Sequence, residues 1–189
     1  MFSENELLAG CLKNSRIHQK AFYDKYAGKM YALCLRYAND DMEAEDYLQE
    51  GFMKVYDNLA KYRNEGSLEG WVRRVIVNLI LQKLRKKKQK LVDIAQENIV
   101  VADTGSDILS QMAATELLEL IRQLPAGYRT IFNLYVLEEY SHKDIAKELG
   151  ISEGTSKSQL SRARIILQKM VLKHESIKDI YYERSRENR

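Results

Sequence analysis

The chain has 189 residues, of which 45% are hydrophobic and 30% charged, with a formal net charge of +3 and a single proline. This composition suits one or two small packed domains and favours helices over β-hairpins. It contains no apolar run long enough to span a membrane, and Glu4 and Glu6 stand where a signal peptide has basic residues. Cys11 and Cys34 each lie among apolar residues, which predicts buried reduced thiols. We therefore expect a cytoplasmic protein with no stable membrane insertion.

Apolar residues at helical spacing predict a helical bundle over residues 1–90. A short helix is expected over residues 5–13, followed by three longer amphipathic helices. Their apolar stripes are Phe22, Tyr26, Met30, Leu33 and Tyr37; Leu48, Phe52, Val55 and Leu59; and Leu68, Val72, Val75 and Leu79.

The next segment, residues 91–111, carries four acidic side chains and no basic one, and predicts a linker. Helical patterns resume over residues 115–122, stop at Leu124-Pro125, and return over residues 128–137 and 142–149. The polar tail from Lys173 onward is expected to fray. The predicted fold class is all-α, with an N-terminal helical bundle (1–90), an acidic linker (91–111), a C-terminal four-helix domain with a helix-turn-helix (112–175) and a polar tail (176–189).

The stretch "HKDIAKELGISEGTSKSQLSRA" predicts the helix-turn-helix. Ala146 allows close helix approach, Gly150 suits the turn, and Ser152 suits the start of the next helix. That helix has a packing stripe of Ser156, Leu160, Ala163 and Leu167 and an opposite face rich in hydroxyl and basic groups. Because Ile165 lies nearly opposite the stripe, base contacts are expected only from residues 155–162. An unrelated helical hairpin is the alternative.

A second candidate face follows the third stripe. Trp71, Arg74, Asn78 and Arg85 recur at steps of three, four and seven residues, and "KLRKKKQK" at 83–90 adds six basic side chains. An aromatic, an amide and two guanidinium groups on one face suit phosphate contacts and base stacking. The alternatives are a core aromatic at Trp71 and a solvated helix end at the lysine run.

Residues 40–50 carry six acidic side chains and no basic one. Such a face repels phosphate and suits a basic protein partner, although a solvated acidic helix start is an alternative. His18, His142 and His174 are scattered, no His or Cys pair has metal-ligand spacing, and no glycine loop suits phosphate binding. We therefore expect no enzyme activity, metal or cofactor.

Four segments together resemble the RNA polymerase sigma factors of the sigma-70 family, specifically the extracytoplasmic-function (ECF) type. They are "AEDYLQEGFMKVY" at 44–56, "GSLEGWVRRVIVNL" at 66–79, "LP" at 124–125 and "YSHKDIAKELGISEGTSKSQLSRAR" at 140–164. The resemblance implies a sigma factor that binds core RNA polymerase, recognises the −35 and −10 promoter elements, promotes melting and directs initiation of a specific regulon. It also implies an inhibitory anti-sigma factor as a further partner.

The resemblance assigns residues 1–90 to the polymerase clamp and the −10 element, and residues 112–175 to the −35 element and the polymerase flap. It implies that Asp46, Gln49 and Glu50 bind polymerase. The implied −10 residues are Tyr62, Arg63, Ser67, Trp71 and Asn78, to which the polar stripe adds Arg74 and Arg85. The −35 residues are Lys157, Ser158, Gln159, Ser161 and Arg162, to which the polar face adds Thr155. Ser156 departs from the family, where Val is frequent at this packing position.

Two other classes of protein remain open from the residues. A stand-alone regulator would bind DNA as a dimer through the helix-turn-helix and use the N-terminal bundle for sensing or dimerisation. An adaptor would hold polymerase without melting DNA. The dimeric regulator needs neither the acidic face of Asp46, Gln49 and Glu50 nor the Trp71–Asn78 stripe, and the adaptor does not need the stripe.

Overall fold

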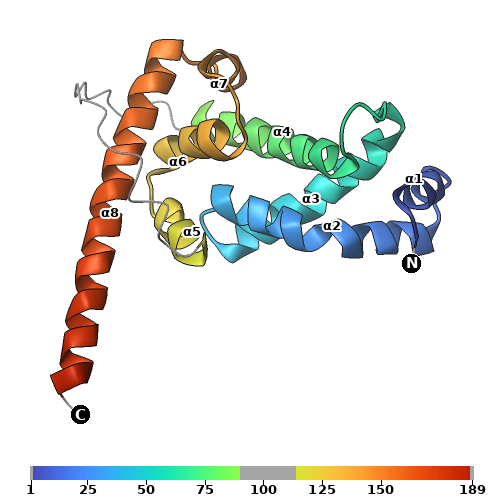
Figure 1. The fold of residues 1–189 in the computed structure, drawn as a ribbon. Helices are drawn as coiled ribbons and strands as arrows, with labels where there is room; N and C mark the ends of the chain where they lie inside the picture. Colours follow the sequence, from blue (N-terminus) through green and yellow to red (C-terminus); the bar gives the residue numbers. More distant parts are fainter. Residues whose placement is uncertain (1, 90–113, 188–189) are drawn as a thin grey trace. The chain divides into compact units, whose positions relative to one another are not determined.

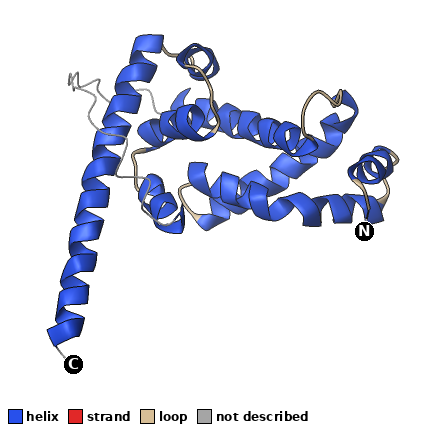
Figure 2. Ribbon diagram, in the orientation of Figure 1, coloured by secondary structure: helices blue, strands red, loops and turns tan. Residues whose placement is uncertain are grey.

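The computed structural model describes residues 2–89 and 114–187, which fall into two compact units, Met1–Ile94 and Ala95–Arg189 (Figure 1). All regular secondary structure in these two ranges is helical, which confirms the predicted all-α class (Figure 2). The predicted acidic linker lies outside the described residues. No described helix is both long and apolar enough to cross a membrane.

Unit 1 contains helices α1 (Glu4–Leu12), α2 (Arg16–Tyr37), α3 (Asp41–Asn58) and α4 (Leu68–Gln89), with the short 3-10 helix η1 (Leu59–Lys61) after α3. Side-chain caps explain where three of these helices begin. Ser3 and Glu6 form a reciprocal capping box on α1, and Asp40 Oδ1 accepts a hydrogen bond from Glu43 N on α3 at 2.7 Å. Ser67 Oγ accepts from Gly70 N at 3.1 Å on α4.

The core of unit 1 confirms the first two predicted stripes and corrects the third. Every residue of the α2 and α3 stripes is buried, and both cysteines are buried and free. On α4, however, Val75 is only half-buried, whereas Ile76 and Ile80 are fully buried. The α4 stripe therefore advances in steps of four from Val72, because α4 packs against both α2 and α3 and needs a wider apolar arc.

Unit 2 contains α5 (Ala114–Arg122), α6 (Ala126–Phe132), the π-helical turn η3 (Asn133–Leu137), α7 (His142–Leu149) and α8 (Glu153–Glu187). Helix α8 packs against α5, α6 and α7. The single helix predicted over residues 128–137 is instead α6 followed by the wider turn, in which Glu138 N donates to Asn133 O at 3.0 Å. The extra residue in this turn rotates the chain before α7 begins.

The prediction that the tail frays from Lys173 is wrong for the backbone, which stays helical to Glu187. No glycine or proline occurs between Thr155 and Glu187, so no residue in this stretch removes a backbone donor or favours a left-handed turn. Helix α8 therefore continues well past Val171, the last buried residue among the side chains of α8 that the structure describes.

Gly51 provides a stability test for unit 1. A Cβ atom at this position would lie 2.8 Å from Cγ1 of Ile76, which is fully buried on α4. We expect Gly51→Ala to destabilise unit 1 by about 1–3 kcal/mol, because Ile76 and its packed neighbours would have to shift to make room for the methyl group. Gly28 on α2 has no neighbour within 4 Å of such a Cβ, so Gly28→Ala should stabilise by about 0.5–1 kcal/mol.

Urea unfolding followed by Trp71 fluorescence measures both variants in the same unit. Equal midpoints for Gly51→Ala and Gly28→Ala would contradict close packing between α3 and α4.

Candidate functional site

The helix-turn-helix of unit 2 is formed by α7, α8 and the three residues between them. Gly150 has a φ of 63°, a left-handed conformation that glycine adopts at little cost. Its N–H and that of Ile151 both bond to the carbonyl of Ala146, the latter at 3.1 Å. Ile145 and Ala146 are buried, so the turn has the close helix packing that the sequence predicted.

The start of α8 presents the predicted polar face. Ser152 caps the helix by accepting from Thr155 N at 2.9 Å, and the packing stripe from Ser156 to Leu167 is buried. Of the six predicted −35 residues, Lys157 and Ser158 are exposed, and Thr155, Gln159, Ser161 and Arg162 are half-buried. Lysine and a hydroxyl group at the start of a helix are suited to phosphate and base-edge contacts.

A histidine that sequence reasoning set aside joins the two helices. His142 Nδ1 and Ser156 Oγ form a hydrogen bond of 2.9 Å, and the His142 ring stacks on Tyr135 with a centroid distance of 4.4 Å. Ser156 has no exposed surface, so this bond gives a buried hydroxyl its partner within the packing stripe. The signal in the sequence was the unusual serine itself, because a polar residue at a packing position needs a partner.

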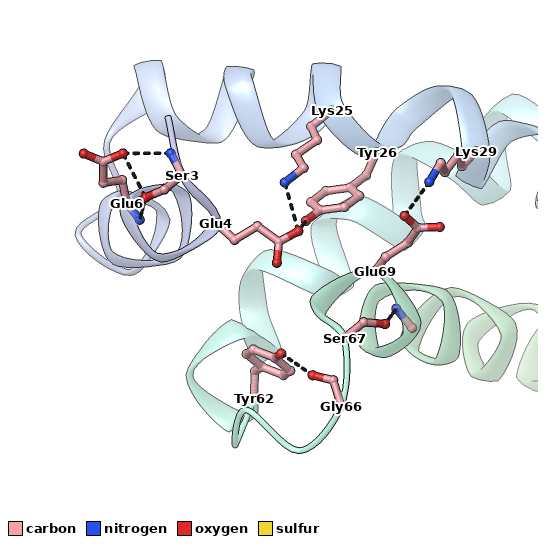
Figure 3. Close-up of polar contacts among 11 residues, drawn as sticks. Ser3, Glu4, Glu6, Lys25, Tyr26, Lys29, Tyr62, Gly66, Ser67 and Glu69 are labelled. Carbon is pink, nitrogen blue, oxygen red and sulfur yellow. Dashed lines mark hydrogen bonds and ion pairs between the residues drawn. The ribbon is translucent and has the colours of Figure 1, made fainter. Parts of the chain in front are cut away.

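In unit 1 the loop before α4 is closed by its own hydrogen bonds (Figure 3). Tyr62 Oη donates to the carbonyl of Gly66 at 2.8 Å, and the Tyr62 ring lies 5.6 Å from the Trp71 ring, centroid to centroid. Asn64 and Gly66 both have positive φ, which turns the chain sharply between them. The loop therefore brings Tyr62 and Trp71, nine residues apart, to one place beside exposed Arg63 and Ser67.

Contacts from α1 and α2 hold the surroundings of this loop (Figure 3). Glu4 accepts from Lys25 Nζ at 2.9 Å and from Tyr26 Oη at 2.8 Å, and these hydrogen bonds lower the pKa of Glu4. Lys29 pairs with Glu69 at 2.6 Å, so α2 is joined to the first turn of α4. These exposed pairs add little stability individually. The Glu4 contacts join α1 to α2, and the Lys29–Glu69 pair joins α2 to the N-terminal end of α4.

The predicted stripe on α4 occupies one helix face. Arg74 and Asn78 are exposed, and Trp71 and Arg85 are half-buried. Their spacing keeps all four on the side of α4 away from buried Val72, Ile76 and Ile80. The face thus combines a partly exposed indole, an amide and two guanidinium groups.

The predicted acidic face lies on α3. Asp46, Gln49 and Glu50 are all exposed, and Ala44, Leu48 and Val55 on other sides of the helix are buried. Glu50 forms an ion pair with Lys83 of α4, and the Lys83 ammonium lies 5.4 Å from the centre of the Tyr47 ring. Of these three side chains, Glu50 is therefore already paired with α4, and its ion pair with Lys83 is open to solvent.

Comparisons with known proteins agree with this arrangement. The sigma-70 region 2 profile matches residues 22–90, and the sigma-70 region 4 profile matches residues 114–167. The chain is 31% identical over 163 residues to the ECF RNA polymerase sigma factor SigW of Bacillus subtilis, covering 78% of this chain and 86% of SigW. The chain belongs to the ECF sigma factors. It acts in transcription initiation.

Two further comparisons extend over most of this sigma factor. It is 25% identical over 169 residues to SigM of Mycobacterium tuberculosis, covering 89% of this chain and 85% of SigM. The sigma factor RpoE of Bartonella quintana, solved with the anti-sigma factor NepR, matches with a TM-score of 0.49 and 24% identity, covering 82% of this chain and 96% of RpoE.

The structure brings the predicted residues together within each unit. The polymerase-binding and −10 candidates lie on unit 1, and the −35 candidates lie within about two turns of α8 in unit 2. Their assignment to polymerase, melted strand and duplex stays a prediction. His142, which bonds to Ser156 between the −35 candidates, was not among the predicted site residues. Lys83, which pairs with Glu50, was predicted only as part of the basic run at 83–90.

The stability of unit 2 should depend on pH through His142. Burial, followed by the positive charge of Lys157, lowers the pKa of His142 below its ordinary 6.5, so the folded state binds this proton less tightly than the unfolded state. Its contribution to stability is therefore complete above pH 6.5 and is lost as the pH falls through the lowered pKa. We expect amide exchange in α7 and α8 to speed up between about pH 7.5 and about pH 5, once corrected for intrinsic rates.

His142→Gln should reduce this pH dependence, and His18→Gln in unit 1 is the control that should leave it unchanged. The same pH dependence in wild type and His142→Gln would show that another group is responsible.

Proposed function

We propose that this sigma factor binds core RNA polymerase through the acidic face of α3, reads the −35 duplex through the start of α8 and holds the melted −10 strand on the Tyr62–Arg85 face. The result is initiation at a specific set of promoters. Asp46, Gln49 and Glu50 would bind the polymerase clamp, and unit 2 would also contact the flap.

The observation that carries the proposal is the division of charge within unit 1. Exposed Asp46 and Glu50 on α3 favour a basic protein surface, whereas Trp71, Arg74 and Asn78 on α4 favour nucleic acid. A protein that only binds DNA has no need of the first face, because it repels phosphate. Two adjacent helices with opposite preferences suit a protein that connects a polymerase to DNA.

The loop between η1 and α4 supports a role in holding unpaired bases. Stacking of a base on an aromatic side chain contributes about 1–3 kcal/mol, which helps to offset the cost of melting. Tyr62 and Trp71 lie at the loop, and its own hydrogen bonds shape it before any base arrives. Preorganisation of this kind reduces the entropy lost on binding.

The two units need only modest affinity each for their parts of a promoter. They are joined by the chain, so binding of one raises the effective concentration of the other at its site. A net charge of +3 gives weak nonspecific attraction to DNA, and polymerase would supply the rest. An anti-sigma partner stays an expectation from the family resemblance, and no residue of this chain is assigned to it.

Transcription in vitro tests the proposed function. Purified core RNA polymerase from the source organism is supplied with a genomic promoter library, with and without this sigma factor. We expect new start sites that share sequence about one and about three helical turns upstream, a turn being about 10 bp. Binding to a palindromic duplex without polymerase and without new initiation would favour the dimeric regulator. Initiation that survives Trp71→Ala and Asn78→Ala would favour the adaptor.

Two double variants should separate the polymerase and DNA functions. Asp46→Ala with Gln49→Ala should weaken polymerase binding about tenfold or more while leaving −35 duplex contacts intact, since these residues lie in unit 1. Lys157→Ala with Arg162→Ala should leave polymerase affinity unchanged but lose promoter binding by the holoenzyme and lessen its salt dependence. Fluorescence anisotropy measures both affinities.

Each double variant is the control for the other, and Asp24→Ala removes one exposed acid from α2 as a charge control. Normal transcription by the Asp46 and Gln49 double variant would contradict the polymerase assignment.

A further inference from the structure

Two methionine side chains on the exposed face of α3 do not pack in the core of unit 1. Met42 is 75% exposed and Met53 is 67% exposed, although large apolar side chains in unit 1 are otherwise mostly buried. The packing of α3 is already satisfied by Leu48, Phe52 and Val55 on its opposite side. The two methionines thus leave thioether and methylene surface in water without contributing to the core.

Helical spacing places the methionines in line with the proposed polymerase-binding residues. Met42, Asp46, Gln49 and Met53 follow one another at steps of four, three and four residues, so they share one stripe. At 1.5 Å per residue the stripe is about 16 Å long, with one methionine near each end. Glu50 flanks it and is paired with Lys83.

The charge around this stripe limits what can bind there. Helix α3 has six acidic side chains, Asp41, Glu43, Glu45, Asp46, Glu50 and Asp57, and one basic side chain, Lys54. A second copy of the chain that met this face with its own α3 would place acids against acids. A basic surface with an apolar strip is complementary to both the charge and the methionines.

We propose that Met42 and Met53 are apolar anchors of the polymerase-binding face, and that core RNA polymerase meets α3 with an apolar strip flanked by basic side chains. This inference rests on the proposed function and adds two contact residues to it. Protein interfaces concentrate binding free energy in apolar centres, while charged groups at the rim set orientation and association rate. Methionine suits such a centre because its flexible, polarisable side chain adapts to the partner surface.

The test is equilibrium binding of the full-length sigma factor to purified core polymerase of the source organism at low and high salt. Met42→Gln with Met53→Gln should weaken binding about tenfold or more at both salt concentrations, because burial of apolar surface is not screened. Asp46→Asn should weaken binding mainly at low salt. Ile17→Gln is the matched control, since Ile17 on α2 is 71% exposed and should not affect binding.

The methionine variant should unfold at the wild-type urea concentration, because neither side chain is in the core. Wild-type polymerase affinity in this variant would overturn the inference, while loss of binding by Asp46→Ala with Gln49→Ala would still support the proposed function. If that acidic-face variant also bound normally, the proposed function itself would fail. Self-association of the wild type that the methionine variant abolishes, with unchanged polymerase affinity, would identify a second copy as the occupant and overturn the inference.

Discussion

Helices α3 and α4 approach closely at Gly51 because the absent side chain leaves room for Ile76. This contact fixes the relation between the two faces that give unit 1 its proposed role. Both helices bury one side against the core, so the acidic side chains of α3 and the aromatic and basic side chains of α4 have to point outward. A bulkier residue at the contact would move one face relative to the other as well as cost stability.

The acidic face of α3 lies on the neighbour of the helix that carries the basic side chains, α4, so ion pairs between the two helices are expected. The ion pair between Glu50 and Lys83 joins the two faces, and it is open to solvent. Exposed pairs of this kind contribute about 1 kcal/mol or less, so a partner with better geometry can replace either side. The acidic face therefore remains available to the proposed protein partner, and the basic face to the proposed nucleic-acid partner.

In unit 2, a glycine turn and a buried hydrogen bond set the geometry of the helix-turn-helix. Gly150 turns the chain in a left-handed conformation, and the bond between His142 and Ser156 joins α7 to α8. A directional hydrogen bond specifies one orientation more strictly than apolar contact does, but it makes the site sensitive to protonation. The start of α8, with exposed Lys157 and Ser158, takes its position from this joint.

The sequence by itself determined which segments are helical, the burial of the α2 and α3 stripes, the glycine turn before α8 and the family, because helical periodicity, capping residues and motif order are local properties of the chain. It misplaced the α4 stripe at Val75, the helix over residues 128–137 and the end of α8, since these depend on how many neighbours a helix has and on where a turn widens. Only the tertiary structure decided that His142 pairs with Ser156, that Glu50 pairs with Lys83 and that Met42 and Met53 stay outside the core. These relations join side chains that are distant along the chain or depend on which helix face meets a neighbour, and neither periodicity nor composition contains that information.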